Sequence, residues 1–133
     1  MRYILLVFIT IFSTFSYCDE LLEESLANCD KNQLAMNICA FHFFEEADIA
    51  LNSGYKELFN SLTNKNNKAR LRLAQHQWVK FRDANCAYEA RGSREEGGSM
   101  FPMAYDQCRE RVTKERTIQL EKFLECTADD CPQ

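Results

Sequence analysis

Apolar residues recur at every third or fourth position along most of this chain, the spacing that places them on one face of an α-helix. From Gln33 to Leu62 the series is Ala40, Phe44, Ala47, Leu51, Tyr55, Leu58 and Leu62. Within Lys68–Arg91 it is Leu71, Ala74, Trp78, Phe81, Asn85 and Tyr88. From Ser99 to Leu124 it is Tyr105, Cys108, Val112, Arg116, Leu120 and Phe123. Each series predicts a helix with one buried face.

The segments between these series indicate how the helices are connected. Thr63–Asn67 is polar and predicts a turn, and Gly92–Gly98 predicts a loop. Ser99 is a candidate N-cap for the third helix, whose first turn tolerates Pro102. Asp19–Asn28 predicts a short acidic helix, and no segment alternates with the period of a strand. The predicted fold class is all-α, a small disulfide-stabilised bundle or hairpin of three to four helices.

The N-terminus has the pattern of a cleaved secretory signal. Arg2 precedes an apolar run, Tyr3–Phe15, which is shorter than the roughly 20 residues that span a bilayer. Cleavage is expected after Ser16 or after Cys18, and a buried core helix is the alternative. We therefore expect residues 1–18 to be a signal peptide and residues 19–133 to form a single helical domain with a short C-terminal tail. The expected location is periplasmic or secreted, in the cell envelope.

Cys18 raises the possibility of a lipid anchor at the mature N-terminus. A lipidated cysteine is ordinarily preceded by a small residue, whereas Tyr17 is large. We therefore do not expect lipidation, and we expect membrane association only if Cys18 carries a lipid.

The cysteines predict disulfides. Of the seven cysteines, six lie beyond the signal, and an even number in a small exported domain is typical of disulfide bonding. Spacing favours three local pairs: Cys86–Cys108, Cys29–Cys39 and Cys126–Cys131. The first pair would join adjacent ends of two antiparallel helices. A zinc site is the alternative, but the chain has no Cys-x-x-Cys pair and its two histidines are isolated.

The charge of the chain restricts its partners. The formal net charge is −4, so a nucleic-acid partner, which needs a basic face, is not expected. A cationic protein partner is electrostatically permitted.

Charged residues interrupt the apolar faces. Arg116 lies within the third series, Arg82 lies one turn from Trp78, and Asp48 lies between Ala47 and Leu51. Because a buried arginine is costly without a carboxylate, we expect Arg116 or Arg82 to meet Asp48 or Asp83 inside the bundle. Two interpretations remain open, a polar binding pocket and an ion pair that fixes helix register. Tyr55, Trp78 and Phe81 are expected to pack in the core.

Nothing in the sequence forms a catalytic set. His42 and His76 have no neighbouring serine nucleophile or paired carboxylate, and a Cys–His pair would need a reduced thiol in an oxidising compartment. We expect no enzyme activity, no cofactor and no metal.

The connector between the second and third helices is the best candidate for recognition. It is polar, glycine-rich and held by the expected Cys86–Cys108 bond, and a constrained loop loses less entropy on binding. A plain connector is the alternative. The candidate binding residues are Arg91, Arg94, Gly97, Gly98, Ser99 and Phe101.

Several motifs together resemble the LprI-type lysozyme-inhibitor family of small exported bacterial domains. They are Cys29, Asn37–Ala40, Ala47–Tyr55, Ala74–Cys86, Gly97–Ser99, Cys108, Thr113, Arg116–Thr117 and Leu120. The resemblance implies an α-helical, disulfide-stabilised envelope domain and a protein partner, with host lysozyme as the candidate. The implied activity is inhibition of lysozyme, the muramidase that cleaves peptidoglycan. The competing hypothesis is an envelope structural or assembly module that binds an endogenous bacterial protein.

Overall fold

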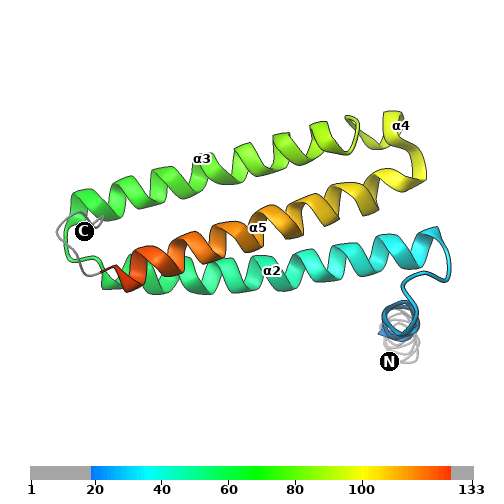
Figure 1. Cartoon of the computed structure of the whole chain (residues 1–133), viewed down its shortest axis with the longest axis horizontal. Coiled ribbons are helices and arrows are strands. Elements are labelled where there is room, and N and C mark those ends of the chain that lie inside the picture. Colours follow the sequence, from blue (N-terminus) through cyan, green and yellow to red (C-terminus); the bar gives the residue numbers. More distant parts are fainter. Residues whose placement is uncertain (1–18, 127–133) are drawn as a thin grey trace, which may run out of the picture.

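The computed structural model describes residues 19–126, and these residues form an elongated helical bundle without strands (Figure 1). The long helices are α2 (Gln33–Ser61), α3 (Lys65–Glu89) and α5 (Phe101–Glu125). A single turn, α4 (Arg94–Gly97), and a 3₁₀ turn, η1 (Gly98–Met100), join α3 to α5, and residues 19–27 are also helical. The all-α prediction is confirmed. The expected tail and the signal segment lie outside the described residues.

Asparagine side chains define two of the helix starts. Asn32 accepts a hydrogen bond from the backbone N–H of Ala35 at 2.9 Å, and Asn64 accepts one from Asn66 at 2.8 Å. Each bond satisfies an amide that the first helical turn leaves without a partner. The cap expected at Ser99 is wrong, because α5 begins at Phe101 after the 3₁₀ turn, with Met100 at the N-cap position and no side-chain cap.

The three long helices do not pack equally. Helix α5 lies close against α2 and less extensively against α3, whereas α2 and α3 make few backbone contacts with each other (Figure 1). One apolar cluster consists of Leu51, Leu58 and Leu120 and includes the partly buried Trp78 and Tyr55. Burying a leucine side chain contributes about 1.5–3 kcal/mol, so this cluster is the main source of apolar stabilisation between α2 and α5.

A second, smaller cluster surrounds the Cys86–Cys108 disulfide and includes Val112. Trp78 contacts both clusters, so it joins the two ends of the α3–α5 interface. The core position expected for Trp78 is confirmed in this partly buried form.

The prediction for the inward face of α3 is wrong by about one residue. Phe81 and Tyr88 were expected in the core, but they are 61% and 84% exposed. The buried residues of α3 are Gln75, Arg82 and Cys86. The disulfide requires Cys86 to face α5, and the helical period then turns Arg82, four residues earlier, to the same side. The two aromatic side chains consequently lie outside the core.

Two of the three expected disulfides are present. Cys29 and Cys39 are bonded with a Cα–Cα distance of 5.8 Å, and Cys86 and Cys108 with 5.4 Å. These four sulfur atoms are therefore not available as zinc ligands. The third expected pair includes Cys131, which lies outside the described residues.

The N-terminal helical segment is tied to the start of α2. The Cys29–Cys39 bond links the two, and the backbone carbonyl oxygen of the buried Ser25 lies 3.2 Å from Cys39 Sγ. Figure 1 shows this segment (blue) beside the N-terminal end of α2. Within residues 19–126, no helix is long and apolar enough to cross a membrane.

Candidate functional site

Arg82 forms a polar cluster in the middle of the bundle. It is 5% exposed, and its Nη1 donates to Asp48 Oδ1 at 2.8 Å while its Nε donates to Asp83 Oδ1 at 2.8 Å. Nη1 also lies 3.3 Å from Thr113 Oγ1. The expected ion pair is confirmed, with Arg82 rather than Arg116 as the cation. Helices α2, α3 and α5 meet at this single guanidinium.

Aromatic rings enclose the guanidinium. Its central carbon lies 5.1 Å from the ring centre of Phe44 and 5.4 Å from that of Trp78. Burial alone would lower the pKa of Arg82, but the hydrogen bonds and charges of Asp83 and Asp48 raise it overall. Arg82 therefore stays charged at every pH at which the protein is folded.

A second arginine extends this arrangement toward the α3–α5 connection. Arg109 pairs with the buried Asp106, and its guanidinium lies 3.7 Å from the ring centre of Phe44 and 4.4 Å from that of Tyr105. Across the described residues, no buried side-chain nitrogen or oxygen lacks a hydrogen-bond partner. The cluster is thus internally satisfied, which favours the interpretation that it fixes helix register over a ligand pocket.

Arg116 takes no part in the ion pairs of Arg82. Its Nε donates to Gln75 Oε1 at 3.1 Å, it also donates to Gln119, and it lies 5.8 Å from the ring centre of Trp78. Burial lowers the pKa of Arg116. Arg82 is thus the arginine that meets the expected carboxylates, whereas Arg116 contacts amides, which neutralise none of its charge.

The tip of the molecule is the connection from Arg91 to Phe101, within which Gly92–Gly98 was expected to be a loop. It instead contains α4 and η1, and its backbone turns at Arg91, Gly92 and Gly98, whose φ angles are 67°, 97° and 60°. Positive φ is ordinarily adopted by glycine, and a non-glycine residue there is strained. The tip is therefore a compact turn with a defined backbone.

Three attachments hold the tip to the bundle. The Cys86–Cys108 disulfide lies directly below it, and Asn37 Nδ2 of α2 donates to the Ser99 carbonyl at 3.1 Å. The ring of Phe101 stacks on Tyr105 with 5.3 Å between centres. Gly97 fits closely, since an added Cβ would lie 2.8 Å from Phe101 Cβ.

The candidate binding residues divide into an outer and an inner set. Arg91, Arg94, Gly98 and Ser99 are exposed, and so is Met100 at 58%. Gly97 and Phe101 are half-buried and hold the turn in place. The arrangement presents two arginines, two glutamates and a hydroxyl at the end of the bundle, so it is suited to a partner surface that offers polar groups of both signs.

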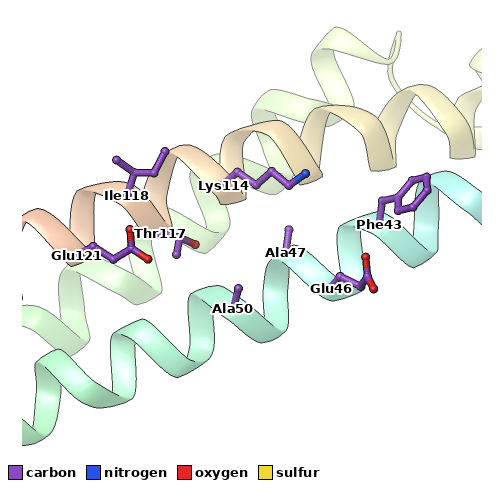
Figure 2. Close-up of a pocket in the computed structure, with 8 residues that line it drawn as sticks. All are labelled: Phe43, Glu46, Ala47, Ala50, Lys114, Thr117, Ile118 and Glu121. Carbon is purple, nitrogen blue, oxygen red and sulfur yellow. The ribbon is translucent and has the colours of Figure 1, made fainter.

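Sequence reasoning did not find the hollow between α2 and α5. It measures about 380 Å³. Figure 2 shows Ala47 and Ala50 opposite α5, with Phe43 and Glu46 nearby on α2. On α5 the lining consists of Lys114, Thr117, Ile118 and Glu121. Two alanines form a weak apolar signal, which explains the omission. The hollow is shallow and bordered by charge.

These features coincide with the segment that matches a known family. Residues 27–120 match the family described as Lysozyme inhibitor LprI. The chain belongs to the LprI family. The matched segment contains both disulfides, the Arg82 cluster and the whole tip. The family is described as an inhibitor family, so a protein partner, rather than a substrate to be converted, is what membership indicates.

A relative is known from Rhizobium meliloti (strain 1021), an uncharacterized protein that is 29% identical over 106 residues. The alignment covers 71% of this chain and 75% of the relative. No solved structure matches the chain. The two disulfides and LprI membership together suggest a location in the periplasm or outside the cell.

Proposed function

We propose that this LprI-family protein is exported with residues 1–18 as its signal peptide and inhibits lysozyme through the tip formed by Arg91–Phe101. The observation that supports the proposal most strongly is the rigid attachment of an exposed, arginine-bearing turn by a disulfide, a hydrogen bond and a ring stack. The choice of lysozyme as the partner rests on the description of the family, Lysozyme inhibitor LprI. Pre-ordering reduces the entropy that binding must overcome.

The chemistry of the tip is complementary to a muramidase cleft. Lysozyme cleaves its polysaccharide with two carboxyl groups. Arg91 and Arg94 are the exposed cations of the tip, and an arginine recognises a carboxylate through paired N–H donors. Ser99 and Met100, next to them, add a hydroxyl and an apolar contact.

Long-range charge also supports this partner. The chain carries a net charge of −4, while host lysozymes are strongly cationic, so the encounter would be accelerated at low ionic strength. In this arrangement the acidic body attracts the enzyme, and the guanidinium groups of Arg91 and Arg94 bind the carboxyl groups of the cleft, although Glu95 and Glu96 leave the tip without a net charge.

A muramidase turbidity assay with residues 19–133 in the oxidised form tests the proposal directly. We expect added protein to slow lysis in proportion to its concentration. The tip variant Arg91→Ala/Arg94→Ala should bind lysozyme about tenfold more weakly or worse, a loss of about 1.4 kcal/mol or more. Arg70→Ala, an exposed arginine on α3 in the opposite half of the molecule, is the matched control and should inhibit like the wild type.

Two outcomes would contradict the proposal. Undiminished lysis at a large molar excess of the folded, oxidised protein would exclude inhibition. Equal inhibition by the wild type and the tip variant would show that lysozyme binds a surface other than the tip. Mass spectrometry of the secreted chain tests the export step, which predicts a mature N-terminus near residue 17 or 19.

A further inference from the structure

One face of the bundle carries opposite charge at its two ends. It is the open face between α2 and α3, where these helices make few backbone contacts and Arg82 spans the gap to Asp48. Positions three and four apart on each helix line this face. On α2 they are Phe41, Glu45, Asp48, Asn52, Lys56 and Phe59, and on α3 they are Lys65, Lys68, Arg72, His76, Val79 and Asp83.

Observed contacts place both rows on the same face. The charged ends of Lys68 and Arg72 lie over the ring of Phe59 at 5.0 and 5.2 Å. At the other end, Asp48 and Asp83 share Arg82. The two helices run in opposite directions, so the early part of α2 and the late part of α3 lie at the same end of the bundle (Figure 1).

The basic end lies beside the α2–α3 turn. It carries Lys56, Lys65, Lys68 and Arg72, and from Lys65 to Arg82 α3 contains no acidic residue. This accumulation is unexpected in a chain whose net charge is −4. Lys68 and Arg72 lie over the ring of Phe59. Arg72 is nevertheless exposed, as are Lys56 and Lys65.

The acidic end lies toward the Cys29–Cys39 bond. Glu45 is exposed, and the side chains of Asp48 and Asp83 are 36% and 41% exposed although both bind Arg82. Phe41 and Ile49 beside them are 45% and 69% exposed. They border a hollow of about 380 Å³ that Phe44, Glu45 and Asp48 also line. Rings and carboxylates together suit a cationic side chain.

The two ends cannot neutralise each other within one molecule. Glu45 and Lys56 are separated by about 16 Å along α2 at 1.5 Å per residue, and ionic screening acts over about 8 Å at physiological salt. Each end therefore retains an unmatched charge.

We propose that this face is a homodimer interface in which a second copy lies antiparallel across it, so that the basic end of each copy covers the acidic end of the other. One two-fold axis brings both complementary contacts together and closes the assembly. A lysine or arginine of the partner copy lies at the hollow beside the exposed Phe41 and pairs with Glu45. The tip stays outside this interface, so the proposal is independent of lysozyme inhibition.

A second copy accounts for the face better than a cationic protein does. A cationic partner would be attracted to Glu45 but repelled by the four cations at the other end of the same face. Only a partner with both signs of charge, in the reverse order, matches both ends, and an antiparallel copy has that pattern by symmetry.

Sedimentation velocity of oxidised residues 19–133, over a concentration series at low and high salt, tests the association. We expect a dimer that dissociates as salt is raised. The basic-end variant Lys65→Glu/Arg72→Glu and the acidic-end variant Glu45→Lys/Ile49→Lys should each be monomeric, because each places like charge at both contacts. Circular dichroism of each variant checks that the helices are intact.

Mixing the two variants is the decisive measurement. In the mixed pair the two altered ends meet at one contact and the two unaltered ends meet at the other, and the charges are opposite at both. The equimolar mixture should therefore form a heterodimer although neither variant dimerises alone. A monomeric wild type, variants that still dimerise, a mixture that stays monomeric, or open-ended assemblies would each overturn the proposal. So would a monomeric wild type whose lysozyme binding is lost in the acidic-end variant, because that result would assign the face to lysozyme.

Discussion

Helix α5 is held by its two neighbours in contrasting ways. Against α2 it buries Leu51, Leu58 and Leu120, an apolar interface with closely approaching backbones. Against α3 the buried residues are Gln75, Arg82 and the Cys86–Cys108 bond, and fewer backbone atoms approach. The α2–α5 pair is thus stabilised mainly by apolar packing, whereas α3 is attached mainly through Trp78, the Arg82 guanidinium and one covalent bond. The tip that the proposed function uses is on the second, sparsely packed side.

Truncating Leu51 should lower the stability of the fold most. Leu51 is 1% exposed and belongs to the apolar cluster between α2 and α5. We expect Leu51→Ala to reduce the free energy of unfolding by about 2–5 kcal/mol through lost burial and a residual cavity. Leu34→Ala, on the same helix and 56% exposed, should change it by about 0.5 kcal/mol or less. Urea denaturation compares the two variants, and equal losses would show that α2 is not held by this cluster.

Removing the Cys86–Cys108 bond should cause the second-largest loss of stability. Its sequence separation is 22 residues, and the chain-entropy account assigns a loop of that size about 3 kcal/mol. We expect Cys86→Ala/Cys108→Ala to lose about that much stability and to expose the backbone amides of the tip to hydrogen exchange. The Cys29→Ala/Cys39→Ala variant is the comparison, since its bond closes a loop of 10 residues at the opposite side of α2. Equal exchange at the tip in the two double variants would contradict this assignment.

Arg82 should contribute less than the disulfide, because Asp48 and Asp83 are exposed enough to recover water when the arginine is removed. Hydrogen bonds to charged groups contribute about 1.5–3 kcal/mol, and we expect Arg82→Met to lose an amount in that range. Arg116→Met is the control, since its recorded partners are the amides Gln75 and Gln119. Thermal unfolding of the two variants measures the difference in stability. A larger loss of stability for Arg116→Met would show that Arg116, and not Arg82, is the more important arginine for the fold.

The same contrast explains which features could be predicted from the sequence. Helices α2 and α5 follow the apolar period because apolar packing places them, and their predicted ends lie within two residues of the observed ones. The period misidentified the inward face of α3 because a disulfide and an ion pair, rather than apolar residues, determine that face. Cys86 was nevertheless a usable signal. Counting four, eight and eleven residues back from it reaches Arg82, Trp78 and Gln75, the residues that do face inward.

The tip could be predicted only in outline. Its polar, glycine-rich composition indicated an exposed connector, and the pairing of Cys86 with Cys108 was inferred from spacing. The turns α4 and η1, the bond from Asn37 to the Ser99 carbonyl and the left-handed backbone of Arg91 depend on contacts between distant segments. No local pattern encodes such contacts. For the same reason Ser99, an attractive cap by residue type, is not the residue that starts α5.

The smallest expected effect concerns pH, and it tests whether surface charge helps to attach α3. Glu89 of α3 accepts hydrogen bonds from Asn85 and from Arg111 of α5, each at 2.8 Å, and these partners lower the pKa of Glu89. A carboxyl group with a lowered pKa stabilises the fold above its ordinary pKa, and this contribution is lost as the pH falls through the lowered value. Glu89→Gln should therefore unfold at a slightly lower temperature than the wild type at neutral pH, and the difference should vanish between about pH 5 and about pH 3. Glu115→Gln removes a contact to the same arginine within α5 alone, at 3.6 Å, so it should not loosen α3. A difference for Glu89→Gln that persists in acid would mean that this side chain acts through packing, and α3 would then depend on the disulfide and Arg82 without help from its surface charges.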